Sequence, residues 1–257
     1  MGDPGSTGEY RERGWDTVEI ADLSELWDRV TGTQPAPELW LVLATAAVAL
    51  AVVTPYGVWR VARNTITIAH EGGHGLVALL TGRKLEGIRL HSDTSGLTVS
   101  RGKPTGLGMI LTAAAGYTAP SLLGLAGAAL LSAGRITALL WGATALLLAL
   151  LVMVRNAYGM LTVLLTGALF LLVSWLTDPE VQAAFAYGVV WFLLLGGVRP
   201  VWELQAKRRR GGARDSDADQ LARLTRMPAP IWLLFFHAVV LACLIAGGGS
   251  LLDAAAP

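Results

Sequence analysis

Long apolar runs alternate with short polar connections along most of the chain. Seven such runs follow residue 38, and each is close to the roughly 20 residues that a helix needs to cross a bilayer. Tryptophans stand near the ends of several runs, where an indole ring favours the membrane–water interface. The pattern predicts an all-α polytopic membrane protein with about seven transmembrane helices, at approximately Leu39–Val58, Asn64–Thr81, Gly106–Ser132, Ile136–Val154, Ala157–Leu176, Gln182–Val201 and Pro230–Leu252.

The first 38 residues differ from the rest because they are polar and net acidic. They begin with a Gly/Ser/Thr-rich stretch whose composition is typical of disorder. We therefore divide the chain into a cytoplasmic N-terminal segment, 1–38, and a multi-spanning domain, 39–252, which includes a basic loop at 202–229. Within the N-terminal segment, four apolar residues recur at helical spacing and predict one amphipathic helix: Ile20, Leu23, Trp27 and Val30.

Composition agrees with a membrane protein. Of the 257 residues, 53% are hydrophobic and only 15% are charged, and the mean hydropathy is +0.52. A soluble domain of this size would carry more charge. The single cysteine, Cys243, lies in an apolar run and excludes an intramolecular disulfide.

The lysines and arginines set the expected orientation. Many of them crowd the loop before the last apolar run, so this loop should be cytoplasmic. The turn Thr177–Glu180 has no basic residue and should be external. Seven crossings of the plasma membrane then place the N-terminus in the cytoplasm and the C-terminus outside. Arg60, Arg63 and Arg135 fall outside in this arrangement, against the rule.

A β-hairpin is expected between the second and third apolar runs. Lys84–Leu90 and Leu97–Arg101 have the composition of strands, and the turn-forming cluster Asp93–Gly96 separates them. The hairpin would lie at the cytoplasmic end of the second run. It is either a plain connector or an exposed strand edge that pairs with an unwound substrate by β-addition.

The second apolar run contains His70-Glu71-Gly72-Gly73-His74. Residues four apart share a helix face, so the two histidines can offer ring nitrogens to one ion. Glu71 lies close enough to take a proton from metal-bound water, which is the chemistry of an H-E-x-x-H zinc site. A chance match is the alternative, but ionisable groups are costly in an apolar helix unless they are paired or used.

These residues and the hairpin that follows them resemble the site-2 protease (M50) family of intramembrane metalloproteases, and more closely its bacterial M50B-like branch. The resemblance covers roughly Asn64–Gly159 and extends to Asp215–Thr225. It implies that His70 and His74 bind zinc and that Glu71 is the general base. The family also supplies an Asp from a later Asn-Pro…Asp-Gly element, whereas Val154–Gly159 here has the asparagine and the glycine but no aspartate.

The third zinc ligand therefore stays open among four residues. Asp217 and Asp219 lie in the basic loop, where they are also suited to the first turn of a helix after an Ser216 N-cap. Asn156 offers a neutral oxygen. His237 stands about 10 Å into the last span, at a depth similar to that of His74, although an interhelical hydrogen bond is its more ordinary role.

The sequence thus predicts an intramembrane zinc metalloendopeptidase that hydrolyses membrane-embedded substrates near the cytoplasmic face. Its expected partners are a membrane-protein substrate and the lipid bilayer, with no nucleic acid. The alternative is a non-catalytic, metal-binding membrane scaffold (a pseudoprotease) that lost the third ligand. A metal transporter is disfavoured, because the other spans supply almost no ionisable residues for a path.

Overall fold

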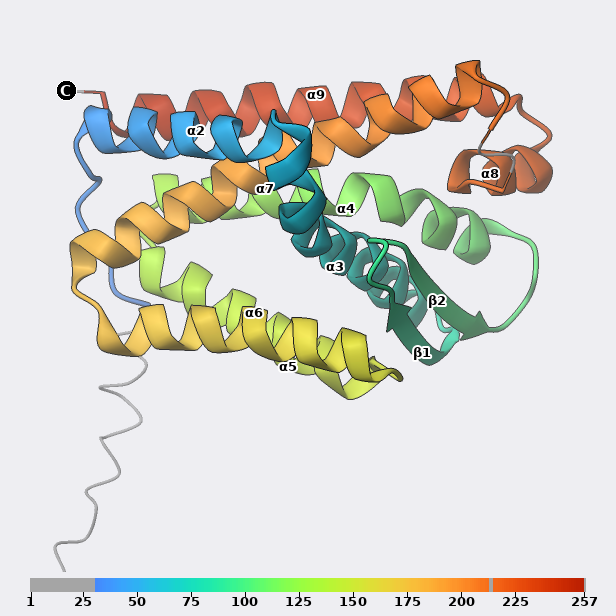
Figure 1. Ribbon diagram of the computed structural model, residues 1–257, viewed down its shortest axis with the longest axis horizontal. Helices are drawn as coiled ribbons and strands as arrows, with labels where there is room; N and C mark the ends of the chain where they lie inside the picture. Colours follow the sequence, from blue (N-terminus) through green and yellow to red (C-terminus); the bar gives the residue numbers. More distant parts are fainter. Residues whose placement is uncertain (1–30, 213–214, 257) are drawn as a thin grey trace, which may run out of the picture.

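The computed structural model describes residues 31–212 and 215–256 (Figure 1). The amphipathic helix and the Gly/Ser/Thr-rich stretch predicted within residues 1–30 lie outside the described residues. The described part is mainly helical, with one small β-hairpin between the second and third of its helices. In chain order its elements are α2 (Leu39–Val53), α3 (Tyr56–Leu80), β1 (Lys84–Leu90), β2 (Gly96–Arg101), α4 (Leu107–Ser132), α5 (Ile136–Met153), α6 (Ala157–Leu176), α7 (Pro179–Arg209), α8 (Asp217–Thr225) and α9 (Ala229–Ala254).

Five helices of the described residues are long and apolar enough to cross a membrane: α4, α5, α6, α7 and α9. The pair α2 and α3 meets the same criterion only as one unit, bent by 104° at a short break. With 15 residues, α2 is about 22 Å long, which is shorter than a hydrocarbon core of about 30 Å. The described residues therefore give five or six spans, and the predicted count of about seven is not confirmed.

The break between α2 and α3 is earlier than predicted. The sequence suggested a polar connection between Val58 and Asn64, but that stretch is helical and the chain bends at Thr54–Pro55 instead. Proline cannot donate a main-chain hydrogen bond inside a helix, yet its fixed φ suits a helix start. Pro55 accordingly ends α2 and precedes the first residue of α3.

Charged and aromatic side chains hold this bend against α7. Arg199 of α7 donates hydrogen bonds to the carbonyl groups of Val53 and Thr54. These groups lie at the C-terminal end of α2, where a helix supplies no N–H donor of its own. Its guanidinium also lies over the Trp59 ring, 4.9 Å from the centroid. Glu203 accepts hydrogen bonds from both Trp59 Nε1 (2.8 Å) and Arg199 Nε (3.0 Å). Paired in this way, the charges are tolerated beside apolar helices.

The two ends of the described chain lie at the same end of the bundle (Figure 1). Gln34 donates its main-chain hydrogen bond to Gly134, in the turn between α4 and α5. Ser132, beside that turn, bonds to the carbonyl of Ser250 near the end of α9. The sequence had placed the two ends on opposite faces. If α2 and α3 together make one crossing, the described residues give six crossings instead of seven. The orientation of the two ends relative to the membrane stays a prediction.

Helices α4, α7 and α9 form the centre of the bundle, and α5 and α6 lie as an antiparallel pair at its side (Figure 1). The largest cluster of buried apolar side chains lies between α4, α7 and their neighbours, and includes Leu131, Tyr187 and Leu194. Close packing depends on small residues. A Cβ on Gly127 of α4 would lie 2.7 Å from Val190 of α7, so only glycine fits there.

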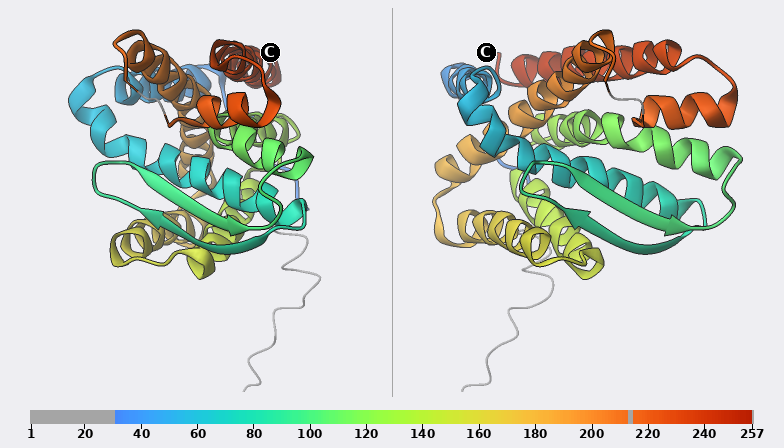
Figure 2. Two further views of the ribbon diagram at one scale, coloured as in Figure 1. Left: turned by 90° about the vertical axis from the view of Figure 1, so that its right-hand side faces the viewer. Right: turned by 45° about the vertical axis from the view of Figure 1, so that its right-hand side comes forward.

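The hairpin forms where the sequence predicts it. β1 and β2 pair antiparallel, from Lys84 opposite Arg101 to Leu90 opposite Gly96. The hairpin runs alongside α3, and β1 also contacts the α5–α6 pair (Figure 2). The outer edge of β1 is partly occupied, because Ile88 forms a parallel bridge with Val154 at the end of α5.

Candidate metal centre

Helix α3 brings His70 and His74 together on one face, as their spacing predicts. Their Nε2 atoms are 3.2 Å apart. The Nδ1–H of His74 donates a 2.7 Å hydrogen bond to the carbonyl of Thr112 in α4. A proton on Nδ1 leaves Nε2 with its lone pair facing the other histidine, which is the tautomer that a metal ligand needs.

Asp217, the first residue of α8, completes a group of three donors. Its Oδ2 atom lies 3.4 Å from Nε2 of His70 and 3.3 Å from Nε2 of His74. This oxygen is buried and accepts no hydrogen bond among the described residues. Burial opposes ionisation of the carboxyl, but its interactions with His74 and His70 outweigh that cost and hold the pKa of Asp217 below its usual range.

The three donor atoms fit a zinc ion. Separations of 3.2 to 3.4 Å correspond to the edges of a tetrahedron whose centre is about 2.0 Å from each corner, the usual Zn–N and Zn–O distance. Space is reserved as well, since a Cβ on Gly116 of α4 would lie 2.3 Å from Nε2 of His74. A buried carboxylate oxygen without a hydrogen bond is otherwise costly. Two imidazoles and one carboxylate are also a donor set found in catalytic zinc sites.

Glu71 lies beside this group but is not part of it. The side chain is 5% exposed, and its Oε2 accepts a 2.6 Å hydrogen bond from the hydroxyl of Thr98 in β2. Gly96 approaches so closely that a Cβ there would lie 2.4 Å from Oε1 of Glu71. The inward face of β2 therefore covers the carboxylate, fixes one oxygen and leaves the other without a hydrogen bond among the described residues.

Two of the four candidate third ligands have structural roles instead. Asp219 forms the capping box of α8 with Ser216 and pairs with Arg208 at 2.6 Å. Partial burial opposes its ionisation, but these hydrogen bonds lower the pKa of Asp219. Asn156 exchanges two hydrogen bonds with the main chain of Leu90, its Nδ2 donating at 2.6 Å and its Oδ1 accepting at 3.1 Å, and so attaches β1 to the start of α6.

His237 does not belong to the metal group either. Its Nδ1–H donates to the carbonyl of Leu233 in the same helix at 2.9 Å, rather than to another helix as its ordinary role suggested. Its ring meets the ring of Trp202 of α7 edge-on, with the centroids 5.0 Å apart. His237 thus supports the packing of α9 against α7.

Three residues that shape the site have no metal-binding signature. They are Thr112, which orients His74, Thr98, which bonds Glu71, and Gly116, which leaves room for an ion. The run of small residues Thr112–Gly116 in α4 is the signal that could have indicated a close approach to α3. No pattern in the sequence indicates that β2 contacts Glu71.

The described residues define a polytopic helical membrane protein with an H-E-x-x-H helix and a carboxylate donor brought from a distant part of the chain. The chain matches the family model Peptidase M50B-like over residues 43–247, and it belongs to this family. The resemblance proposed from the sequence is thereby confirmed. No curated protein and no solved structure matches the chain. Family membership supports a metallopeptidase that works within the membrane.

Proposed function

We propose that the chain is an intramembrane zinc metalloendopeptidase in which His70, His74 and Asp217 hold zinc and Glu71 is the general base. The observation that carries the proposal is the set of donor separations, 3.2 to 3.4 Å, which suits tetrahedral zinc with one position left for water. Its substrates are membrane-embedded proteins, cut near the cytoplasmic face of the plasma membrane.

The residues divide the chemistry between them. Zinc supplies Lewis-acid activation of a water molecule and of the peptide carbonyl. Glu71 accepts the proton of the attacking water on Oε1, since Oε2 is held by Thr98, and then delivers it to the leaving amine. Thr112 keeps His74 in the required tautomer throughout.

The outer edge of β2 suits an extended substrate. Val154 occupies part of the outer edge of β1, but no strand among the described residues pairs with β2 on its other side. A transmembrane helix must unwind before its carbonyl groups can be attacked, and β-addition would replace the hydrogen bonds it loses. Thr98 of β2 already contacts Glu71, so a peptide on this edge passes close to the base.

The cytoplasmic location rests on charge. Helix α8, which begins with Asp217, and the hairpin lie toward the end of the bundle where Lys207, Arg208 and Arg209 form the last turn of α7 (Figure 1). Basic residues favour the cytoplasmic side. The scaffold alternative assumes the loss of the third ligand, and the position of Asp217 beside both histidines supports the peptidase instead.

Glu71→Gln tests the proposal, because it removes the proton acceptor and keeps the size of the side chain. Cells expressing the wild type or the variant are compared for new protein ends within transmembrane segments, and zinc is measured in both purified proteins. We expect equal zinc and a rate of cleavage lower by about 10² or more. Equal cleavage in both strains, or none in either, would favour the scaffold.

A further inference from the structure

The C-terminal end of α7 extends past the length that a bilayer core requires. The helix has 31 residues and is about 46 Å long, whereas the hydrocarbon core is about 30 Å thick. Its last turns carry Lys207, Arg208 and Arg209. Under the proposed orientation these turns lie at the level of the lipid headgroups, next to the start of α9.

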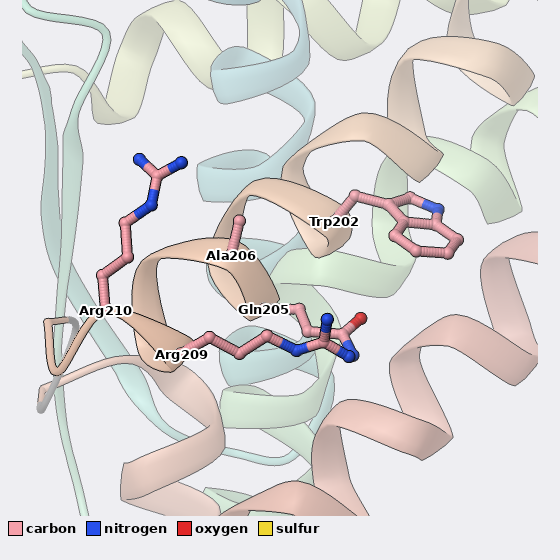
Figure 3. A pocket seen from close by; sticks show the side chains of 5 residues that line it. All are labelled: Trp202, Gln205, Ala206, Arg209 and Arg210. Atoms are coloured by element: carbon pink, nitrogen blue, oxygen red, sulfur yellow. The ribbon is translucent and has the colours of Figure 1, made fainter.

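Two adjoining hollows border this end of α7, and Gln205 and Arg209 line both of them. One has a volume of about 230 Å³ and is also lined by Trp202 and Ala206. The other, of about 500 Å³, is also lined by the Arg208–Asp219 pair and extends to Gly211, Gly212 and the start of α9 at Pro230 and Leu233. We call the two together the α7–α9 groove. Figure 3 shows the Arg209 guanidinium beside the Gln205 amide, with the Trp202 ring further along the helix.

Three arginines line the groove, and the charge of Arg209 is one that no residue of the described chain neutralises. Arg208, its neighbour, pairs with Asp219 at 2.6 Å. Arg209 is exposed and makes no ion pair or hydrogen bond within the described ranges. A guanidinium presents a planar fork of N–H groups that matches a phosphate, and the Gln205 amide adds a further donor beside it.

Trp202 supplies the apolar part of the groove. Its side chain is 54% exposed, and the ring of His237 holds it edge-on at 5.0 Å. Trp202, Gln205 and Arg209 follow one another at spacings of three and four, so they lie on one face of α7. That face changes from aromatic to amide to cation toward the end of the helix. The same order, from apolar to charged, is found in a phospholipid between its glycerol region and its phosphate.

From this arrangement we propose that the α7–α9 groove binds the headgroup of an anionic phospholipid. The phosphate contacts Arg209 and Gln205, and the glycerol and upper acyl chains lie against Trp202. Basic pockets between helices at the cytoplasmic face are known to select anionic headgroups. The site is separate from the metal donors, and the proposal holds whether or not the protein cleaves peptides.

The full chain, purified in detergent, is titrated with phosphatidylglycerol and, separately, with phosphatidylcholine. Native mass spectrometry counts the bound lipids. We expect one phosphatidylglycerol to be retained more tightly than phosphatidylcholine, and its affinity to fall about tenfold in Arg209→Gln. Arg226→Gln is the matched control, because Arg226 is exposed near the same end but does not line the groove. Arg209→Lys, which keeps the charge, should recover part of the affinity.

Several results would overturn the proposal. Equal losses in Arg209→Gln and Arg226→Gln would mean diffuse attraction to surface charge. Equal retention of both lipids would mean that the groove does not select for headgroup charge. Displacement of the lipid by millimolar glycerol 3-phosphate would assign the groove to a soluble phosphate. If a polyglutamate peptide binds more tightly than phosphatidylglycerol and this binding depends on Arg209, the groove would be assigned to an acidic protein segment.

Discussion

The β-hairpin and α8 both reach α3 from outside the long helices, yet they are held there in different ways. The hairpin has a main-chain ladder between its strands, interrupted by one register shift between Leu85 and Gly87, and a bridge from Ile88 to Val154. Helix α8 has nine residues and depends on side chains. Ala218 and Leu221 are fully buried, and Asp219 pairs with Arg208.

The two elements also deliver different chemistry. The hairpin places a hydroxyl and a glycine against the carboxylate of Glu71, the proposed general base. Helix α8 contributes Asp217, one of the three proposed metal donors. The hairpin therefore contacts a group that α3 already carries, whereas α8 supplies a group without which the donor set is incomplete.

The largest loss of zinc affinity is expected from Asp217→Ala. Removing one of three donors should lower zinc affinity by at least about 100-fold, since losing a group that only supports a ligand already costs 10- to 100-fold. Competition with a fluorescent zinc chelator measures the affinity. His91→Ala, in the hairpin, provides the control, and it should bind zinc as the wild type does. Unchanged affinity in Asp217→Ala would remove α8 from the site.

A smaller effect is expected from Thr98→Val. The change removes the hydroxyl that bonds Glu71 and nearly preserves the shape of the side chain. A hydrogen bond to a charged group contributes about 1.5–3 kcal/mol, so cleavage should slow about tenfold or more while zinc remains bound. Thr98→Ser retains the hydroxyl and should stay close to the wild type. Loss of zinc in Thr98→Val would show that the hairpin supports the metal rather than the base.

The smallest effects should come from the residues that attach each element to the bundle. The variants are Asp219→Ala, which releases α8 from Arg208, and Asn156→Ala, which releases β1 from the start of α6. Each loses polar contacts that contribute about 1 kcal/mol. Hydrogen exchange should quicken in α8 for the first variant and in β1 for the second. Only Asp219→Ala should weaken zinc binding, by a few-fold, because only α8 carries a donor. A matching loss of zinc in Asn156→Ala would contradict the division between the two elements.

The sequence predicted the hairpin and the histidine pair well because they depend on residues close together in the chain. It could not identify Asp217, because that position depends on contacts between distant segments. The hairpin depends on local alternation around the turn Asp93–Gly96, and both strands were placed almost to the residue. The histidine pair depends on helical spacing alone. Asp217 was indistinguishable from Asp219, because both suit the first turn of a helix, and only the packing of α8 on α4 decides which one faces the histidines.

The number of crossings was harder to predict, since hydropathy does not reveal a bend. Pro55 and the 15 residues of α2 are visible in the sequence, but the contacts of Arg199 with the end of α2 are not. The structure also accounts for one of the three arginines that are against the expected charge rule. Arg63 does not lie in an external loop, because it belongs to α3 and pairs with Glu203 at 3.2 Å.

The distance along the chain between the donors has a consequence for biosynthesis. His74 and Asp217 are 143 residues apart (217 − 74), and α4, α5, α6 and α7 lie between them. Because a chain is made from its N-terminus, the ribosome has completed most of the membrane domain before the carboxylate exists. A nascent or truncated chain ending before residue 217 thus has two histidines and a glutamate but lacks the third donor, and should be inert while it is still being inserted among other membrane proteins.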